Sequence, residues 1–239
     1  KCPIIAERLH AGDTDVGSLK TYTLAPDGRI IGTANDSLTL DTVKGKEPDM
    51  ISISGNVYAI AYAGDGDDGF LKTVTIAGNG QISDTVIDTL EFDTVKGKTP
   101  NVIPISGNVY AIAYAGDGDD GFVKTVTIAT DGQISDTIID TLEFDTVKGK
   151  TPNIIPISGD VYAIAYAGDT DDGFLITVTI ATDGQITDTV IDALEFDTVK
   201  GKDANIIPIS GDVYAIAYSG DTDDGFLKTI EITDSGQIP

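Results

Sequence analysis

Hydrophobic and polar positions alternate along short segments of this chain, and no window has the 3.6-residue period of a helix. Residues 109–114 place small apolar side chains on one face and large apolar side chains on the other. Because both faces are apolar, we expect a strand that is buried on both sides. Residues 103–106 and 122–128 predict two more strands. Residues 134–144 mix acidic with apolar side chains, which predicts a solvated outer strand.

Two kinds of connection separate these segments. Gly107-Asn108 and Asp131-Gly132 are typical of tight hairpin turns, because Gly and Asn tolerate a positive φ. The other two connections, residues 116–121 and 145–153, are longer. In an up-and-down sheet the connections alternate, so we expect both tight turns on one side and both long loops on the other.

The same pattern returns every 52 residues. The segment that starts at Gly107 recurs almost unaltered at Gly55, Gly159 and Gly211. We therefore divide one repeat domain, residues 1–239, into a divergent first repeat (1–54), three full repeats (55–106, 107–158 and 159–210) and a partial one (211–239). Divergence is typical of a terminal repeat, which has different neighbours.

Four antiparallel strands for each repeat of about 50 residues predict an all-β fold, a β-propeller of four-stranded antiparallel blades. We expect five blades with incomplete terminal blades, because the repeats supply 18 strands where five full blades need 20. Pro104, Pro156 and Pro208 lie inside the first strand of their repeats, which suits an edge strand because proline lacks an N–H. A stack of β-sandwiches and a β-solenoid are the alternatives.

A resemblance supports the propeller. Residues 152–164 carry a Pro-led strand followed by Gly-Asp-Val-Tyr, and this segment resembles the blades of prokaryotic (archaeal or bacterial) cell-surface propeller repeats. The resemblance covers nearly the whole chain. It implies the architecture and does not imply one function.

The net charge of −24 limits the partners. No basic surface is available to neutralise phosphates, so we expect no nucleic acid partner. No run of 18 apolar residues occurs, so we expect no membrane insertion. Cys2 is the only cysteine and cannot form a disulfide within the chain.

An acidic loop follows the second strand of each of the last four repeats, with three carboxylates within four residues and a glycine or threonine between them. Such a loop can gather oxygen ligands for Ca²⁺, although it is shorter than an EF-hand loop, and a solvated acidic hairpin is the simpler interpretation. The candidate metal ligands are Asp65, Asp67, Asp68, Asp117, Asp119, Asp120, Asp169, Asp171, Asp172, Asp221, Asp223 and Asp224.

A pair of lysines separated by glycine lies in the other long loop, which we expect on the same rim as the acidic loops. The pairs are Lys44 and Lys46, Lys96 and Lys98, Lys148 and Lys150, and Lys200 and Lys202. They either compensate the neighbouring acidic loops or form a ring of mixed-charge sites that binds a polyanion or a carbohydrate. Of these, the last three pairs are our candidate ligand-binding residues.

Two tyrosines recur on one face of the second strand, at Tyr110 and Tyr114 in the third repeat. Tyrosines can stack on sugars, but core packing is the better interpretation. No catalytic constellation is evident, because His10 is the only histidine and no nucleophile has an assignable base.

We therefore expect a non-catalytic binding or structural module rather than an enzyme, located outside the cell or at its surface. Repeated loops on one face predict multivalent adhesion or surface assembly, with a polysaccharide, a protein polymer or the protein itself as partner. The alternative is a propeller lectin, or a glycosidase or lyase that acts on polysaccharide. An enzyme should carry a unique cluster in one repeat, and the unique residues Glu7, Arg8, His10 and Arg29 look like terminal drift.

Overall fold

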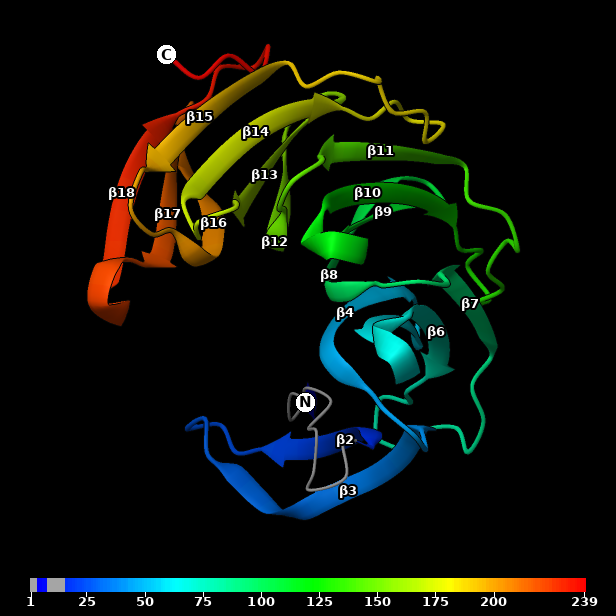
Figure 1. The fold of residues 1–239 in the computed structure, drawn as a ribbon. Helices are drawn as coiled ribbons and strands as arrows, with labels where there is room; N and C mark the ends of the chain where they lie inside the picture. The colour runs from blue at the N-terminus through cyan, green and yellow to red at the C-terminus, as the bar shows by residue number, and fades with distance from the viewer. Residues whose placement is uncertain (1–3, 8–15) are drawn as a thin grey trace. The chain divides into compact units, whose positions relative to one another are not determined.

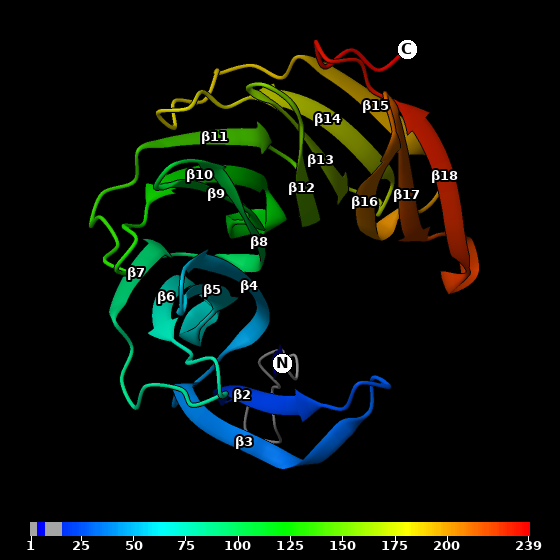
Figure 2. The ribbon, with the colours of Figure 1, turned by 180° about the vertical axis from the view of Figure 1, so that it is seen from behind.

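The computed structural model describes the backbone of residues 4–7 and all of residues 16–239, so Cys2, Arg8 and His10 lie outside the described residues. The chain folds into antiparallel sheets and short turns (Figure 1 and, from behind, Figure 2). It divides into two compact units: unit 1 comprises residues 1–98 and 128–136, and unit 2 comprises residues 99–127 and 137–239. Each unit has a hydrophobic core of its own.

Unit 1 holds two sheets. The strands of the first are β1 (Ile4–Glu7), β2 (Gly17–Leu24) and β3 (Ile30–Asp41), and those of the second are β4 (Lys46–Ser54), β5 (Val57–Ala63), β6 (Gly69–Thr75) and β7 (Asp88–Asp93). Leu19 and Leu40 of the first sheet pack against Ile60, Tyr62 and Val74 of the second. The two sheets are therefore stacked face to face.

Unit 2 holds three sheets. Their strands are β8 (Lys98–Ser106), β9 (Val109–Ala115), β10 (Gly121–Thr127) and β11 (Asp140–Asp145); β12 (Lys150–Ser158), β13 (Val161–Ala167), β14 (Gly173–Thr179) and β15 (Asp192–Asp197); and β16 (Lys202–Ser210), β17 (Val213–Ser219) and β18 (Gly225–Glu231). Three of the acidic loops contain a 3-10 turn, at η1 (Asp65–Asp67), η2 (Asp117–Asp119) and η3 (Asp221–Asp223).

The strand pattern predicted from the sequence is confirmed with two shifts. The described residues form sheets of three, four, four, four and three strands, in the order of the repeats. The predicted first strand, residues 103–106, extends back to Lys98. The predicted outer strand, residues 134–144, is too long: Ile134 makes only an isolated bridge to Ile128, and β11 begins at Asp140.

Alternating small and large side chains on the second strand stack the sheets of unit 2. Ala111 and Ala113 on β9 pack against Tyr162, Ile164 and Tyr166 on β13, and all five are almost completely buried. The small face of one sheet thus receives the large face of the next. This confirms the prediction that the strand is buried on both sides and that the tyrosines belong to the core.

The hairpin turn of each repeat docks on the sheet of the preceding repeat. The hydroxyl of Thr125, fully buried on β10, donates a hydrogen bond of 2.6 Å to the carbonyl oxygen of Gly184. The carboxylate of Asp140 accepts one of 2.8 Å from the N–H of Ile186. The same two bonds recur as Thr21–Gly80 with Asp36–Ile82, Thr73–Gly132 with Asp88–Ile134, and Thr177–Gly236 with Asp192–Ile238. We call residues 77–82, 129–134, 181–186 and 233–238 the docked turns.

Only glycine fits the turn position that accepts the threonine hydroxyl. Gly132 has a φ of +93°, and a Cβ there would lie 2.7 Å from Cδ1 of Ile87. Backbone conformation and packing therefore both require glycine. This explains why Asp131-Gly132 forms the tight turn that the sequence predicts.

Pro156 lies on β12, which pairs with β13 alone and is an edge of its sheet. The chain places proline where no ladder partner needs an N–H. The edge assignment made from the sequence is confirmed.

Candidate functional site

Backbone contacts fix the two long loops against each other. In the acidic loop, Gly116 and Asp120 close the turn through a hydrogen bond of 2.8 Å, and Asp119 has a left-handed backbone with a φ of 70°. The N–H of Gly149 in the lysine loop donates a bond of 2.7 Å to the carbonyl oxygen of Asp119. A Cβ at Gly149 would lie 2.3 Å from Cα of Gly121, so the glycine between the lysines permits this close approach.

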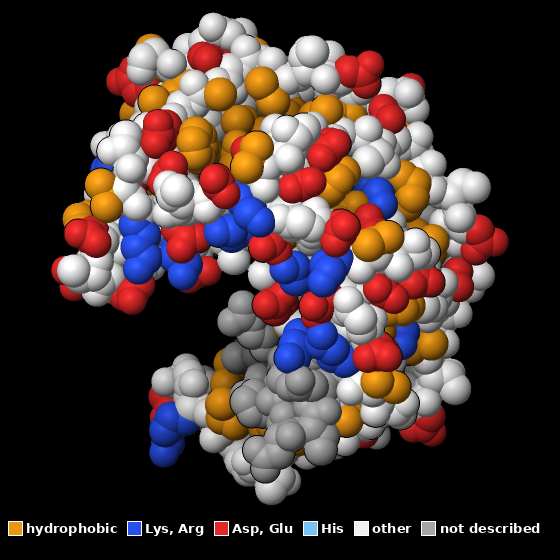
Figure 3. All heavy atoms as spheres, in the orientation of Figure 1, with side chains coloured by type: hydrophobic (Ala, Val, Ile, Leu, Met, Phe, Trp, Pro, Cys, Tyr) orange, Lys and Arg blue, Asp and Glu red, His pale blue; other side chains and the backbone are white. Residues whose placement is uncertain are grey.

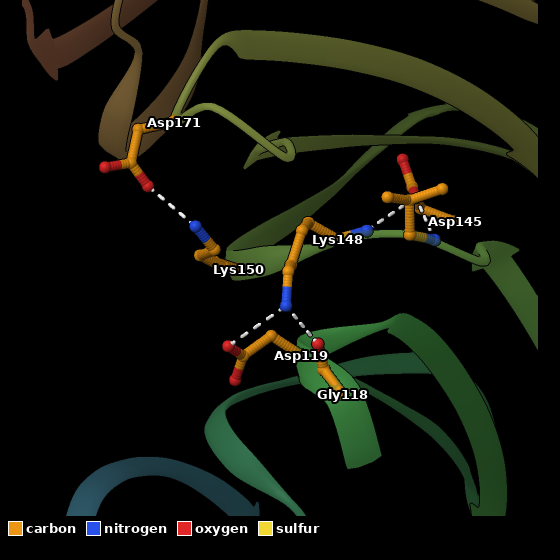
Figure 4. Close-up of polar contacts among 7 residues, drawn as sticks. Gly118, Asp119, Asp145, Lys148, Lys150 and Asp171 are labelled. Atoms are coloured by element: carbon orange, nitrogen blue, oxygen red, sulfur yellow. Dashed lines mark hydrogen bonds and ion pairs between the residues drawn. The ribbon is translucent and has the colours of Figure 1, made fainter.

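The lysines reach into the acidic loops. Lys148 Nζ lies 2.5 Å from the carbonyl oxygen of Gly118 and 3.6 Å from Asp119 Oδ2, while Lys150 Nζ lies 2.7 Å from Asp171 Oδ1 (Figure 4). Lys202, one repeat further on, lies 3.8 Å from Asp171 Oδ2. Asp171 thus lies between lysines of two successive loops. Figure 3 shows lysine and acidic side chains side by side on this face of unit 2.

Unit 1 repeats the arrangement. Asp67 accepts a hydrogen bond from Lys44 and lies 3.9 Å from Lys96. In unit 2, Asp223 accepts one from Lys200. The structure therefore brings together the lysine pairs and the middle aspartate of each loop. We call the contacts of this kind within unit 2, which involve Asp119, Asp171 and Asp223, the Lys–Asp rim.

The lysines set the ionisation of the rim. The hydrogen bond from Lys150 holds the pKa of Asp171 below its usual range, and Lys44 has the same effect on the pKa of Asp67. Among the described residues, every carboxyl group with a clear pKa shift is shifted downward. Asp171 and Asp223 in unit 2 are therefore ionised and paired with lysines near neutral pH.

A strained residue lies next to the rim. Thr151 has a φ of 46°, an unusual conformation for a β-branched residue, and the register of β12 shifts between Lys150 and Asn153. The hydroxyl oxygen of Thr151 is buried and has no hydrogen-bond partner. The bulge directly follows Lys150, which pairs with Asp171, and backbone strain of this kind is typical of functional positions.

The first and third aspartates of the acidic loops lie outside the contacts with the lysines described above. The first aspartate of each acidic loop is exposed, and Asp224 in the last loop accepts a hydrogen bond of 3.0 Å from Thr222. Among residues 16–239, no group of three or more His, Cys, Asp or Glu side chains is placed to hold a metal ion. Calcium binding by the acidic loops thus stays a prediction from the sequence.

The core tyrosines have polar partners that the sequence analysis missed. The hydroxyl of Tyr166 donates a hydrogen bond of 3.0 Å to Asp145 on the preceding sheet, and burial, together with that carboxylate, raises the pKa of the phenol. Tyr62 bonds Asp41 in the same way, and Lys72 lies 5.4 Å from the centre of the Tyr62 ring. A signal was present, because an aspartate ends every outer strand at the same position.

Comparison with known proteins identifies other proteins that have a similar fold. No family model and no curated protein sequence matches the chain. A protein from Bifidobacterium bifidum S17 that is assigned as an exo-β-1,3-galactanase superposes with a TM-score of 0.58 and 12% identity, over 98% of this chain and 85% of that chain. An α-L-arabinofuranosidase from Lactobacillus brevis has a TM-score of 0.53 and 9% identity, over 94% and 86%.

The similarity extends to a protein with another role. A complex of the fission yeast SREBP–SCAP binding domains has a TM-score of 0.51 and 10% identity, over 96% of this chain and 60% of that chain. At such identities the similarity shows the fold alone. The fold is the predicted all-β propeller type with four-stranded antiparallel sheets. The cell-surface class of repeat stays a prediction.

The prediction that the chain is not an enzyme is wrong on this comparison. Two of the similar structures are assigned as glycosidases, so the scaffold carries catalysis in those proteins. Our argument against an enzyme used the near-identity of the repeats, and it did not take into account that a scaffold of this fold occurs in glycosidases.

The part of the chain that the structure describes contains no helix of the length and apolarity needed to cross a membrane. Its only helices are single 3-10 turns of three residues each.

Proposed function

We propose that the protein binds a polysaccharide along the Lys–Asp rim. The observation that carries the proposal is Asp171, an ionised carboxylate between Lys150 and Lys202 next to the strained Thr151. Ammonium groups donate hydrogen bonds and carboxylates accept them, so the pair matches sugar hydroxyls, which do both. Loops on a rigid sheet scaffold are where binding residues usually lie.

A neutral polymer fits the rim better than a polyanion. The lysines that could attract anionic groups already pair with aspartates, as Lys150 does with Asp171. The chain as a whole carries a net charge of −24, which repels a polyanion at long range. We therefore assign a neutral glycan as the ligand class.

Repetition supports a polymeric ligand. Similar loop pairs recur every 52 residues, so a polymer that contacts several of them gains avidity without any single tight site. Such a partner, and the extracellular or cell-surface location that it implies, belong to this proposal.

Affinity electrophoresis or calorimetry with neutral galactan and arabinan, and with polygalacturonate as the anionic comparison, tests the proposal. The double variant Lys150→Ser, Lys202→Ser should weaken binding of the neutral polymer at least about tenfold, or about 1.4 kcal/mol. Arg29→Ser, which also removes a positive charge at an exposed position, is the control. Binding that prefers the anionic polymer, or that the double variant leaves unchanged, contradicts the proposal.

Hydrolysis of the glycan is a second candidate function, favoured by the similarity in fold to a galactanase and an arabinofuranosidase. Cleavage needs a pair of carboxyl groups, one of them ionised, and Asp171 is held in its ionised form. Release of reducing ends from galactan or arabinan, lost in Asp171→Asn, would establish it. Binding without any release of reducing ends would leave a lectin-type function.

A further inference from the structure

The sheet of β16, β17 and β18 has an exposed face, whereas the corresponding faces of the other two sheets in unit 2 are covered. Leu227 on β18 is 71% exposed, whereas Leu175 at the same position of the preceding repeat is fully buried. Thr229 is exposed, whereas Thr177 is buried and holds a docked turn. Ile207 and Ile209 on β16 are also exposed, by 52% and 57%. We call Ile207, Ile209, Leu227 and Thr229 the receptor face.

The first sheet of unit 1 has an exposed hairpin turn that corresponds to the docked turns of the later repeats. Residues 25–29 form a turn with the same hydrogen bonding as the docked turns, in which the N–H of Gly28 donates to the carbonyl oxygen of Ala25 at 2.9 Å. Gly28 has a φ of +85° and no atom near its Cβ position. Ile30 is 56% exposed, whereas Ile82 in the next repeat is 6% exposed against the neighbouring sheet. We call residues 25–30 the open turn.

We propose that copies of this chain associate head to tail, with the open turn of one copy docked on the receptor face of another. The hydroxyl of Thr229 would donate to the carbonyl oxygen of Gly28, as Thr177 does to Gly236. Ile30 would pack beside Leu227, as Ile186 packs in the same cluster as Val123. Both halves are present in one sequence, so each copy can donate and receive.

The internal contacts argue for a second copy as the occupant. Each of the four docked turns meets a threonine-bearing face, and the contact always joins a turn to a face. A symmetric pairing of two receptor faces would lack the turn and leave the threonine hydroxyl without its acceptor. A heterologous, head-to-tail contact is therefore the geometry that satisfies both surfaces.

Charge agrees with this polarity. Residues 1–54 carry six basic and eight acidic side chains, whereas residues 211–239 carry one basic and six acidic side chains. The nearly balanced first repeat thus suits the acidic last one. The net charge of −24 for each copy still opposes association at long range, so added salt should favour assembly.

Sedimentation velocity across a wide concentration range, at low and high salt, tests the proposal. The protein should form dimers and longer oligomers as concentration and salt increase. Leu227→Asp and Ile30→Asp should each weaken association at least tenfold. Val147→Asp, which changes an equally exposed loop residue of 55% exposure, is the matched control and should leave association unchanged. Circular dichroism melting checks that each variant is folded.

Mixing the two variants gives the decisive result. Ile30→Asp keeps its receptor face and Leu227→Asp keeps its open turn, so an equimolar mixture should form dimers and nothing longer. A wild-type protein that stays monomeric overturns the proposal. So does a loss of association in Leu227→Asp alone, which indicates a symmetric contact, or a mixture that stays monomeric.

Discussion

Replacing Thr125 by valine isolates the contact that joins one repeat to the next. The two side chains have nearly the same shape, so the substitution removes the hydroxyl and leaves the packing on β10 in place. Thr125 is fully buried, and its hydrogen bond to the carbonyl oxygen of Gly184 is 2.6 Å long. Without the hydroxyl this carbonyl loses its partner within a buried turn. We expect a loss of stability of about 1–3 kcal/mol, the usual cost of an orphaned buried polar group.

A matched control is built into the chain. Thr229 occupies the same position in the last repeat, but its side chain is exposed, so Thr229→Val should change the stability by less than about 0.5 kcal/mol. For a chain of this size, 1 kcal/mol corresponds to a shift of about 2–4 °C in the melting temperature. Thr125→Val should therefore melt roughly 2–12 °C lower, and Thr229→Val should melt with the wild type.

Hydrogen exchange supplies a local measurement. The N–H of Ile186 bonds Asp140 within the same docked turn, so its protection should fall in Thr125→Val while that of Ile238 is unchanged. Equal melting shifts for Thr125→Val and Thr229→Val would refute the reasoning. Unchanged protection of Ile186 would also refute it, since the turn would then be held by other contacts.

Three further predictions follow from single residues. Because the pKa of Asp171 is lowered by Lys150, the stability from this pair is present above the ordinary carboxyl pKa of about 3.9 and is lost as the pH falls below it, so the melting temperatures of wild type and Lys150→Met should converge in acid. Ile176→Lys should cost less than about 1 kcal/mol in chemical denaturation although Ile176 is 2% exposed, because all four other repeats carry lysine at this position. In two of them, at Lys72 and Lys228, the ammonium group lies within 4 Å of an aspartate of the preceding repeat. Gly132→Ala should destabilise more than Gly28→Ala, because both have a positive φ but only the first would clash, and a larger melting shift at Gly28 would contradict this.

The repeat and its strands could be predicted because local pattern determines them. Two-residue alternation located β9 and β10, and turn residues such as Gly107 marked their ends. The start of β11 at Asp140 could not be predicted, because the preceding apolar residues contact β10 and the residue after it through single bonds rather than through a continuous ladder. The N–H of Ile139 bonds the carbonyl oxygen of Thr125 at 2.8 Å, a contact that depends on how the chain folds back rather than on periodicity.

The rim could be predicted in outline but not in detail. Turn alternation placed lysines and aspartates on one side, as the contact between Lys150 and Asp171 confirms. Which of the three aspartates is paired follows from the left-handed backbone at the middle position, with a φ of 69° at Asp171, and this was not evident from composition. A polar residue inside an apolar strand, such as Thr125, was the one available signal for the docked turn.

Near-identical repeats do not make equivalent sites, because position along the array changes what the same side chain contacts. Lys148 bonds the carbonyl oxygen of Gly118, whereas Lys200 in the same loop position bonds the carboxylate of Asp223. Leucine at one repeat position is fully buried at residue 175 and mostly exposed at residue 227. A search for a unique cluster in the sequence therefore misses asymmetry that arises from neighbours. A chain of repeated units can therefore present different surfaces with the same side chains, and the head-to-tail proposal depends on that property.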